Sequence, residues 1–156
     1  LNDVVEYDFL SAFPSPVDRN EFNAWFKANE STMYKVSDLA AHAKNILQSW
    51  ESKFELYYIS ARGKNVYDIT YNWFNEHNIP FDHIELIGSH DKIEMARRYN
   101  VDAFFEDKHD NAVMIAEELN IPVILFDTPY NRLPVPQNVI RVENWLQANE
   151  WINKIF

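Results

Sequence analysis

Cysteine, glycine, long apolar runs and basic side chains are absent or scarce in this chain of 156 residues. Without cysteine, the chain forms neither a disulfide framework nor a cysteine-ligated zinc site. With only 2 glycines, it has no glycine-rich loop for a nucleotide's phosphates. No apolar run approaches the roughly 20 residues of a membrane-spanning helix, so we expect no membrane partner. Its net charge of −10 argues against polymeric nucleic acid as a partner, because the phosphates would be repelled.

The residues that are present indicate a packed globular protein. Apolar residues make up 47% of the chain and aromatic residues 15%, a composition unlike that of disordered chains. A chain of this length buries roughly 68–70% of its unfolded surface, which suits one domain with a small appendage. Since no signal-peptide pattern is visible, we expect a soluble, cytoplasmic protein.

From about residue 37 onward, apolar runs typical of buried strands alternate with helical patterns. Strands are predicted over 54–60, 83–88, 102–106, 122–127 and 138–142, and helices over 39–50, 66–74, 91–99, 111–119 and 144–155, the first of these capped by Ser37. Such alternation predicts an α/β fold, a Rossmann-like parallel sheet with helices on both faces. Residues 36–156 would form this core.

Residues 1–35 lack the alternation and contain one amphipathic helical pattern, so we interpret them as a small helical addition outside the sheet. Its apolar stripe carries Phe22, Trp25 and Phe26.

Ligands of parallel sheets bind beyond the carboxyl ends of the strands, where the sequence places several polar residues. Ser60 ends a predicted strand, and Arg62 and Lys64 follow it close to a helix start. A hydroxyl, free backbone N–H groups and cations together suit an anionic oxygen. The alternative is an ordinary turn with solvated cations.

Lys92 lies in the predicted first turn of a helix that follows the next strand. A cation there opposes the helix dipole at a cost of typically 0.3–1 kcal/mol, so its charge is a candidate for binding an anion in the cleft. A surface lysine with a solvated head group is the alternative.

Glu106 and Asp107 follow a third strand, and Asp110 comes three residues later. Carboxylates this close repel one another and suit a hard cation with oxygen ligands, Mg²⁺ more than Zn²⁺. For Asp110 the simpler interpretation is a helix N-cap.

Taken in order, these residues resemble the motifs of the haloacid-dehalogenase-type phosphohydrolases. In that family a Ser or Thr ends one strand, a lysine follows, and an acidic pair ends a later strand, matched here by Ser60, Lys92, and Glu106 with Asp107. The segment "ELIGSHDKIEMARRYNVDAFFEDKHDNA" is similar to the 5′-deoxyribonucleotidase-like branch and its uncharacterised bacterial nucleotidases. The resemblance covers about residues 37–145.

The family's first motif, Asp-x-Asp at the end of the central strand, does not occur in this sequence. Three interpretations stay open: the strand and its motif lie upstream of residue 1, the protein is a relative without catalysis, or the resemblance misleads. We favour the first. Without a central strand, two strands would face a gap with unpaired backbone groups, each costing about 1–3 kcal/mol when buried.

The resemblance implies a Mg²⁺-dependent phosphomonoester hydrolase, specifically a 5′-nucleotidase that acts on (deoxy)nucleoside monophosphates through an aspartyl-phosphate. Asp107 would hold Mg²⁺ together with the missing aspartates, and Glu106 and Asp110 are further candidates for that metal site. The nucleophile would be the missing Asp.

The resemblance also implies that residues 1–35 are a small helical cap, because the family inserts a cap between its first and second motifs. In such a cap, Phe9, Trp25, Phe26 and Tyr34 would offer flat surfaces to a nucleobase. The alternative, which we prefer for Phe22, Trp25 and Phe26, is that these rings pack the core of the cap itself.

The same resemblance implies that Ser60, together with the backbone at Ala61 and Arg62, binds the phosphate and that Lys92 balances its charge. The partner would be a small phosphorylated molecule, and a homodimer is possible. A catalytically inactive phosphate- or nucleotide-binding relative and a small-metabolite phosphatase remain the alternatives.

Overall fold

The structure is a computed structural model that describes residues 8, 10, 13, 17–89 and 91–156. Its strands are β1 (Tyr57–Ser60), β2 (His83–Leu86), β3 (Phe104–Glu106), β4 (Val123–Phe126) and β5 (Val139–Val142). Its helices are α1 (Arg19–Lys35), α2 (Ala43–Trp50), α3 (Tyr67–His77), α4 (Ile93–Arg98), α5 (His109–Leu119) and α6 (Trp145–Ile155), with a 3₁₀ turn, η2 (Lys64–Val66), before α3. Parallel strands flanked by helices confirm the predicted α/β, Rossmann-like fold.

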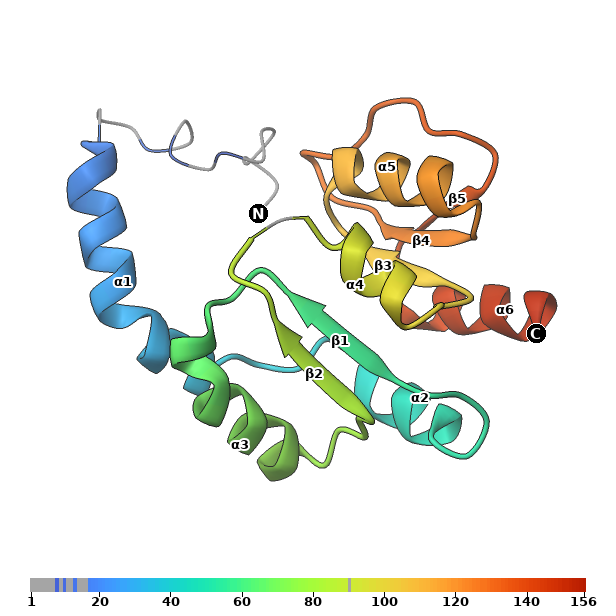
Figure 1. Ribbon diagram of the computed structural model, residues 1–156, viewed down its shortest axis with the longest axis horizontal. Coiled ribbons are helices and arrows are strands. Elements are labelled where there is room, and N and C mark those ends of the chain that lie inside the picture. The colour runs from blue at the N-terminus through green and yellow to red at the C-terminus, as the bar shows by residue number, and fades with distance from the viewer. Residues whose placement is uncertain (1–7, 9, 11–12, 14–16, 90) are drawn as a thin grey trace.

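The strands form two parallel sheets. β1 pairs with β2, and the second sheet has the order β3–β4–β5. Among the described residues, no hydrogen-bonded ladder joins the two sheets, although β1 faces the side of β3 (Figure 1). Thus the edge of each sheet that faces the other is unpaired within the described part of the chain.

Two apolar cores nevertheless run across both sheets and make them one layer. Successive strand residues alternate between the two faces, as the pleat requires. Tyr58 and Ile84 of the first sheet and Ile124 of the second belong to one core, whereas Ile59 and Leu125 belong to the other. α2, α3 and α6 cover the first face, and α4 and α5 cover the second.

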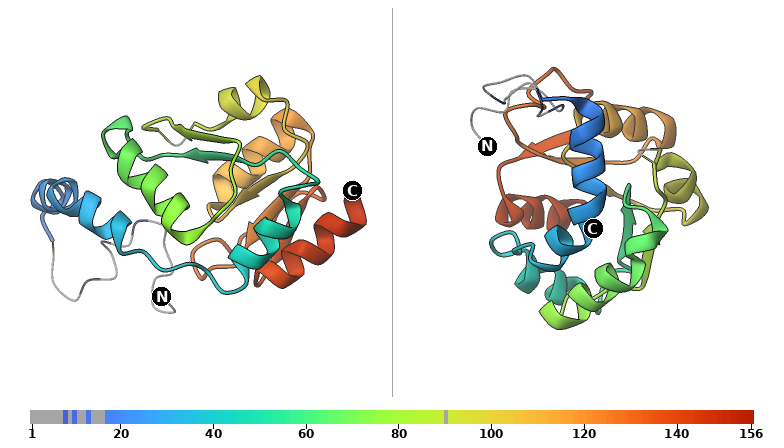
Figure 2. Two further views of the ribbon diagram at one scale, coloured as in Figure 1. Left: turned by 90° about the horizontal axis from the view of Figure 1, so that it is seen from below. Right: turned by 90° about the vertical axis from the view of Figure 1, so that its left-hand side faces the viewer.

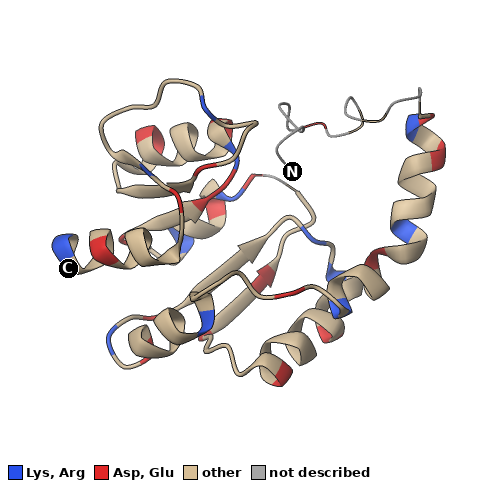
Figure 3. Ribbon diagram, turned by 180° about the vertical axis from the view of Figure 1, so that it is seen from behind, with Lys and Arg blue, Asp and Glu red and all other residues tan. Residues whose placement is uncertain are grey.

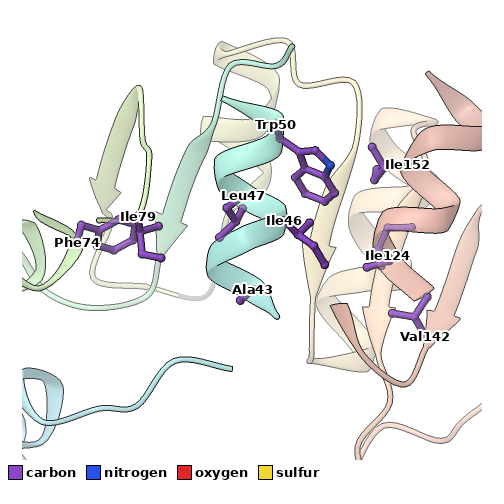
Figure 4. Close-up of a cluster of buried hydrophobic side chains, with 10 residues drawn as sticks. Ala43, Ile46, Leu47, Trp50, Phe74, Ile79, Ile124, Val142 and Ile152 are labelled. Atoms are coloured by element: carbon purple, nitrogen blue, oxygen red, sulfur yellow. The ribbon is translucent and has the colours of Figure 1, made fainter. Parts of the chain in front are cut away.

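α2 packs against both halves of the layer and holds them together. On one side of this helix Leu47 points toward Phe74 of α3, and on the other Ile46 and Trp50 point toward the second sheet and α6 (Figure 4). The indole N–H of Trp50 also donates to Asn149 Oδ1 at 2.8 Å. α2 therefore lies between the two halves and contacts both of them.

α1 extends away from the sheets, as Figure 1 and the left view of Figure 2 show. Among the described residues, no side chain of α1 is buried, and this helix packs against α3. Asp18 begins the helix, because its carboxylate accepts from the backbone N–H groups of Asn20 and Glu21. The division into a cap over 1–35 and a core over 36–156 remains a prediction.

The predicted helix caps are wrong in two places. The Ser37 hydroxyl donates to the Met33 carbonyl at the end of α1, and α2 begins later, after His42 in a left-handed conformation. Asp110 is not an N-cap either, since α5 begins at His109 and Asp110 lies in its first turn. Within the residues described, no helix combines the length and apolarity needed to cross a membrane.

Candidate active site

A groove of about 680 Å³ lies between the facing edges of the two sheets. It is lined by residues of β1 and β3, with side chains of α2, α3 and α6 among the apolar residues around it. Ser60 lies on its wall at the carboxyl end of β1. Of the predicted site residues, Ser60 and Arg62 line this groove, whereas Lys92, Glu106 and Asp107 are not among its described lining residues.

Ser60 is held by the loop that follows β1. Its Oγ accepts a hydrogen bond from the backbone N–H of Arg62 at 3.3 Å, which is long for such a bond. The Ile87 N–H donates to the Ser60 carbonyl, and the Gly88 N–H donates to the Arg62 carbonyl, so the loops after β1 and β2 lie together. Gly88 has a φ of 69°, which favours glycine at this close approach.

The Arg62 side chain is directed toward helices. Its Nη1 donates to Thr70 Oγ1 of α3 at 3.2 Å, and its guanidinium carbon lies 3.8 Å from the centroid of the Tyr34 ring of α1. Burial lowers the pKa of Arg62, an effect that the neighbouring Tyr34 opposes. The structure thus uses this guanidinium to connect α1 with the loop around Ala61.

Lys92 joins the end of β2 to the end of β3. It is the N-cap residue of α4, and its Nζ lies 2.5 Å from Glu106 Oε1. Their side chains are 15% and 1% exposed, so the pair is largely buried. The position of Lys92 against the helix dipole is explained by this carboxylate.

Glu106 is fully engaged by donors. Lys92 Nζ and Asn111 Nδ2 donate to its Oε1, and the backbone N–H groups of Asp107 and Lys108 donate to its Oε2. Burial alone would raise the pKa of Glu106, but the charge of Lys92 and these hydrogen bonds hold it below its ordinary value. Its role as a metal ligand stays a prediction, although both oxygens already have partners.

Asp107, by contrast, has an exposed carboxylate at the same edge. Its Oδ2 accepts from the Tyr130 hydroxyl at 2.8 Å, and its backbone carbonyl accepts from Asn131 Nδ2 at 2.7 Å. Asp110, 80% exposed, is paired with His109 Nδ1. Asp107 is thus the exposed carboxylate that directly follows Glu106 and its ion pair with Lys92.

The described residues contain no group of three or more His, Asp or Glu side chains that could hold a metal ion. A single exposed carboxylate fits Mg²⁺ nonetheless, because this ion is usually bound by one or two carboxylates, waters and substrate phosphates. Asp107 would be one such ligand.

The sequence analysis did not single out three residues that contribute to this edge, namely Asn111, Tyr130 and Asn131. The last two lie in the turn after β4, and the polar residues that follow the apolar run in "LFDTPYNR" could have indicated them. Figure 3 shows acidic and basic positions interspersed along the chain rather than basic ones gathered on one element. Polar side chains at the carboxyl edge of parallel strands are the arrangement by which α/β enzymes bind their ligands.

The chain matches no family model, but three relatives match it over nearly all its length. A putative nucleotidase of Halalkalibacterium halodurans is 47% identical over 154 residues, which are 99% of this chain and 78% of the relative. A putative nucleotidase of Bacillus subtilis is 48% identical over 98% of this chain and 78% of its own length. A nucleotidase of Clostridium acetobutylicum is 27% identical over 99% of this chain and 79% of its own. The chain belongs to the nucleotidase family that these relatives represent.

Proposed function

We propose that this protein is a Mg²⁺-dependent 5′-nucleotidase of the haloacid-dehalogenase type, which hydrolyses (deoxy)nucleoside monophosphates. Family membership supports a nucleotidase, and the ordered motifs around Ser60, Lys92 and Asp107 support the finer assignment. A nucleotide is accordingly the expected small-molecule partner.

The observation that carries the proposal is the Lys92–Glu106 ion pair across the carboxyl edge of the strands. Because it connects the segment after β2 with the end of β3, it brings a cation close to the exposed carboxylate of Asp107. Ser60 ends β1, the strand between them in space. A hydroxyl, a cation and a carboxylate at one edge are what phosphoryl transfer needs.

The groove between β1 and β3 is an argument for a further strand at this position. The edges of the two sheets that face each other have unpaired backbone groups in the described part of the chain, and an extended segment can add to such edges by main-chain hydrogen bonds. A strand running parallel to its neighbours would end between Ser60 and Asp107. In the family that the sequence resembles, this strand ends in Asp-x-Asp.

Within this proposal each residue of the chain has one task. The Ser60 hydroxyl donates to a phosphate oxygen, while Lys92, held in place by Glu106, balances negative charge on the transferred group. Asp107 would hold Mg²⁺, which when bound screens the repulsion between nucleophile and phosphate. The buried ion pair holds the Lys92 ammonium group in place before substrate arrives.

The proposed reaction proceeds in two displacements. A carboxylate oxygen of the first Asp bonds to phosphorus as the ester P–O bond breaks, and the leaving nucleoside oxygen takes a proton from the second Asp. Water then attacks phosphorus as the P–O bond to the first Asp breaks, one proton of the water passes to the second Asp, and inorganic phosphate and both free aspartates are regenerated. Both aspartates belong to the strand proposed for the groove.

Nucleoside monophosphates are favoured over other monoesters by the family and by the aromatic side chains of α1. Trp25 is 54% exposed there, and Phe26 and Tyr34 contact each other with ring centroids 6.5 Å apart. Trp25 is thus available to a base, whereas the Tyr34 ring has Arg62 over it and Phe9 lies outside the described residues. A homodimer and the two alternative functions, an inactive binding relative and a small-metabolite phosphatase, carry no specific observation.

The test is hydrolysis of deoxynucleoside monophosphates and sugar phosphates by the full-length protein, with Mg²⁺ or with EDTA. We expect nucleotides to be preferred, EDTA to abolish turnover, and Asp107→Asn to lower kcat/KM at least 100-fold without unfolding the protein. Asp68→Asn, an exposed carboxylate on α3, is the matched control. Hydrolysis that survives EDTA and Asp107→Asn would overturn the mechanism.

A further inference from the structure

We propose that the turn after β4, residues 128–131, positions Asp107 for its cation, with Tyr130 orienting the carboxylate and Asn131 fixing the backbone. This inference rests on the proposed function, since it assigns a purpose to contacts around the metal-holding carboxylate. Neither residue would touch the reacting atoms, so both are positioning residues.

Tyr130 acts on the side chain of Asp107. Its hydroxyl donates to Oδ2 at 2.8 Å, from a residue 23 positions further along the chain. An exposed carboxylate otherwise rotates about its last bond, but a donor on one oxygen fixes the plane and leaves the second oxygen directed elsewhere. Carboxylates that bind metals are commonly held by such outer partners, whose loss typically costs 10–100-fold in metal affinity or activity.

Asn131 acts on the backbone of Asp107. It is 0% exposed, and its Nδ2 donates both to the Asp107 carbonyl and to the Phe126 carbonyl, each at 2.7 Å. Its Oδ1 accepts from the Thr128 N–H at 3.1 Å and from Arg141 Nη1 at 2.6 Å. The buried amide therefore ties the ends of β3, β4 and β5 to one another.

Burial of a polar amide is costly unless its hydrogen bonds are made, and here both Nδ2 and Oδ1 of Asn131 have two partners each. Such a residue holds its neighbours in one arrangement, because any shift of the Asp107 loop would leave buried groups unpaired. Backbone and carboxylate of Asp107 are thus fixed by adjacent residues of a single turn. The bond from Asn131 to the backbone and the bond from Tyr130 to the carboxylate together fix the direction of this exposed side chain.

The first experiment measures Mn²⁺ binding by electron paramagnetic resonance, without nucleotide, in the full-length protein. Tyr130→Phe removes only the hydroxyl, so we expect the Mn²⁺ Kd to rise about tenfold. Tyr71→Phe, on the exposed side of α3, is the matched control and should leave the Kd unchanged. In activity assays, Tyr130→Phe should raise the Mg²⁺ concentration for half-maximal rate by a similar factor, while kcat at saturating Mg²⁺ falls little.

The second experiment separates positioning from stability. Asn138 is also an amide whose Nδ2 donates to two carbonyls, those of Ala116 and Ile121, away from the carboxyl edge. Asn131→Ala and Asn138→Ala should both lower the Tm, but only Asn131→Ala should weaken Mn²⁺ binding. Should Asn131→Ala fail to fold, the Tyr130→Phe comparison still decides the matter.

The possible failures are distinguishable. If the unmodified protein shows no Mg²⁺-dependent hydrolysis, the proposed function is overturned. If it does, yet Tyr130→Phe binds Mn²⁺ as tightly as Tyr71→Phe, the positioning role is overturned while the function stands.

Discussion

The carboxyl edges of the two sheets are built in opposite ways. At the β3–β4–β5 edge, Glu106 accepts from four donors and the buried Asn131 makes four hydrogen bonds. At the β1–β2 edge, the described residues give Ser60 Oγ one long hydrogen bond, from a backbone N–H. Within the described residues, the first edge is held by many hydrogen bonds, whereas the second holds the Ser60 Oγ by a single one.

The difference follows from charge. A buried carboxylate such as Glu106 is stable only when paired and hydrogen-bonded, whereas a half-buried hydroxyl loses far less when its bonds are poor. Prearranged charges also accelerate reactions, because they need no reorganisation in the transition state. Mutations at the two edges should therefore separate effects on stability from effects on turnover.

The largest effect on stability is expected at the Lys92–Glu106 pair. Lys92→Met leaves the Glu106 carboxylate buried without its cation, so unfolding in urea should require about 3–5 kcal/mol less free energy. Activity should also be lost in the fraction that stays folded. The exposed pair Arg97–Glu118 is the control, and Arg97→Met should change stability by less than about 1 kcal/mol.

The double variant Lys92→Met with Glu106→Gln sharpens this comparison. Because it removes both charges, it should recover part of the stability that Lys92→Met loses, while activity stays low. A double variant no more stable than Lys92→Met would contradict a buried ion pair as the source of the effect.

Local patterns sufficed for the strands and for the strand-end residues. All five strands were predicted from apolar runs, and Ser60, Glu106 and Asp107 were located because ligands bind at the ends of parallel strands. Each of these inferences uses a segment of fewer than a dozen residues or a rule about sheet edges.

Pairings between distant segments were not predictable in this way. Lys92 was interpreted by its own helix dipole, but the structure pairs it with a carboxylate 14 residues away. Asn131 was not singled out in the sequence, yet its amide donates to a carbonyl 24 residues earlier. Such contacts depend on which strands become neighbours, and apolar periodicity does not encode that choice.

At the β1–β2 edge, a mutation should change turnover much more than stability. Ser60→Ala removes a donor to the phosphate, so kcat/KM should fall about 100-fold, as when an oxyanion donor is deleted. The Tm should change little, since the hydroxyl accepts a single long bond within the described structure. Ser49→Ala, whose hydroxyl donates to Ile46 in α2, is the control and should leave kcat/KM unaltered. A Ser60→Ala enzyme with full activity would remove Ser60 from the phosphate site.

The smallest effect is expected where α1 meets the Ser60 loop. The Arg62 guanidinium lies over the Tyr34 ring and donates to Thr70, so it connects α1 and α3 through the residue whose N–H holds Ser60 Oγ. A cation–π contact of this kind contributes about 0.5–2 kcal/mol. Tyr34→Leu should therefore cost about 1 kcal/mol of global stability or less.

Its local consequence should be larger than its global one. Described attachments of α1 are its packing on α3, a hydrogen bond from Asn65 to Glu30 and the Tyr34–Arg62 contact. Because no described side chain of α1 is buried, loss of the last contact should speed proteolytic cleavage within α1 several-fold while residues 43–156 stay resistant. Trp25→Leu, which removes a ring that is 54% exposed, should leave the cleavage rate nearly unchanged. Equal cleavage rates for both variants would mean that contacts other than the one between Tyr34 and Arg62 hold α1.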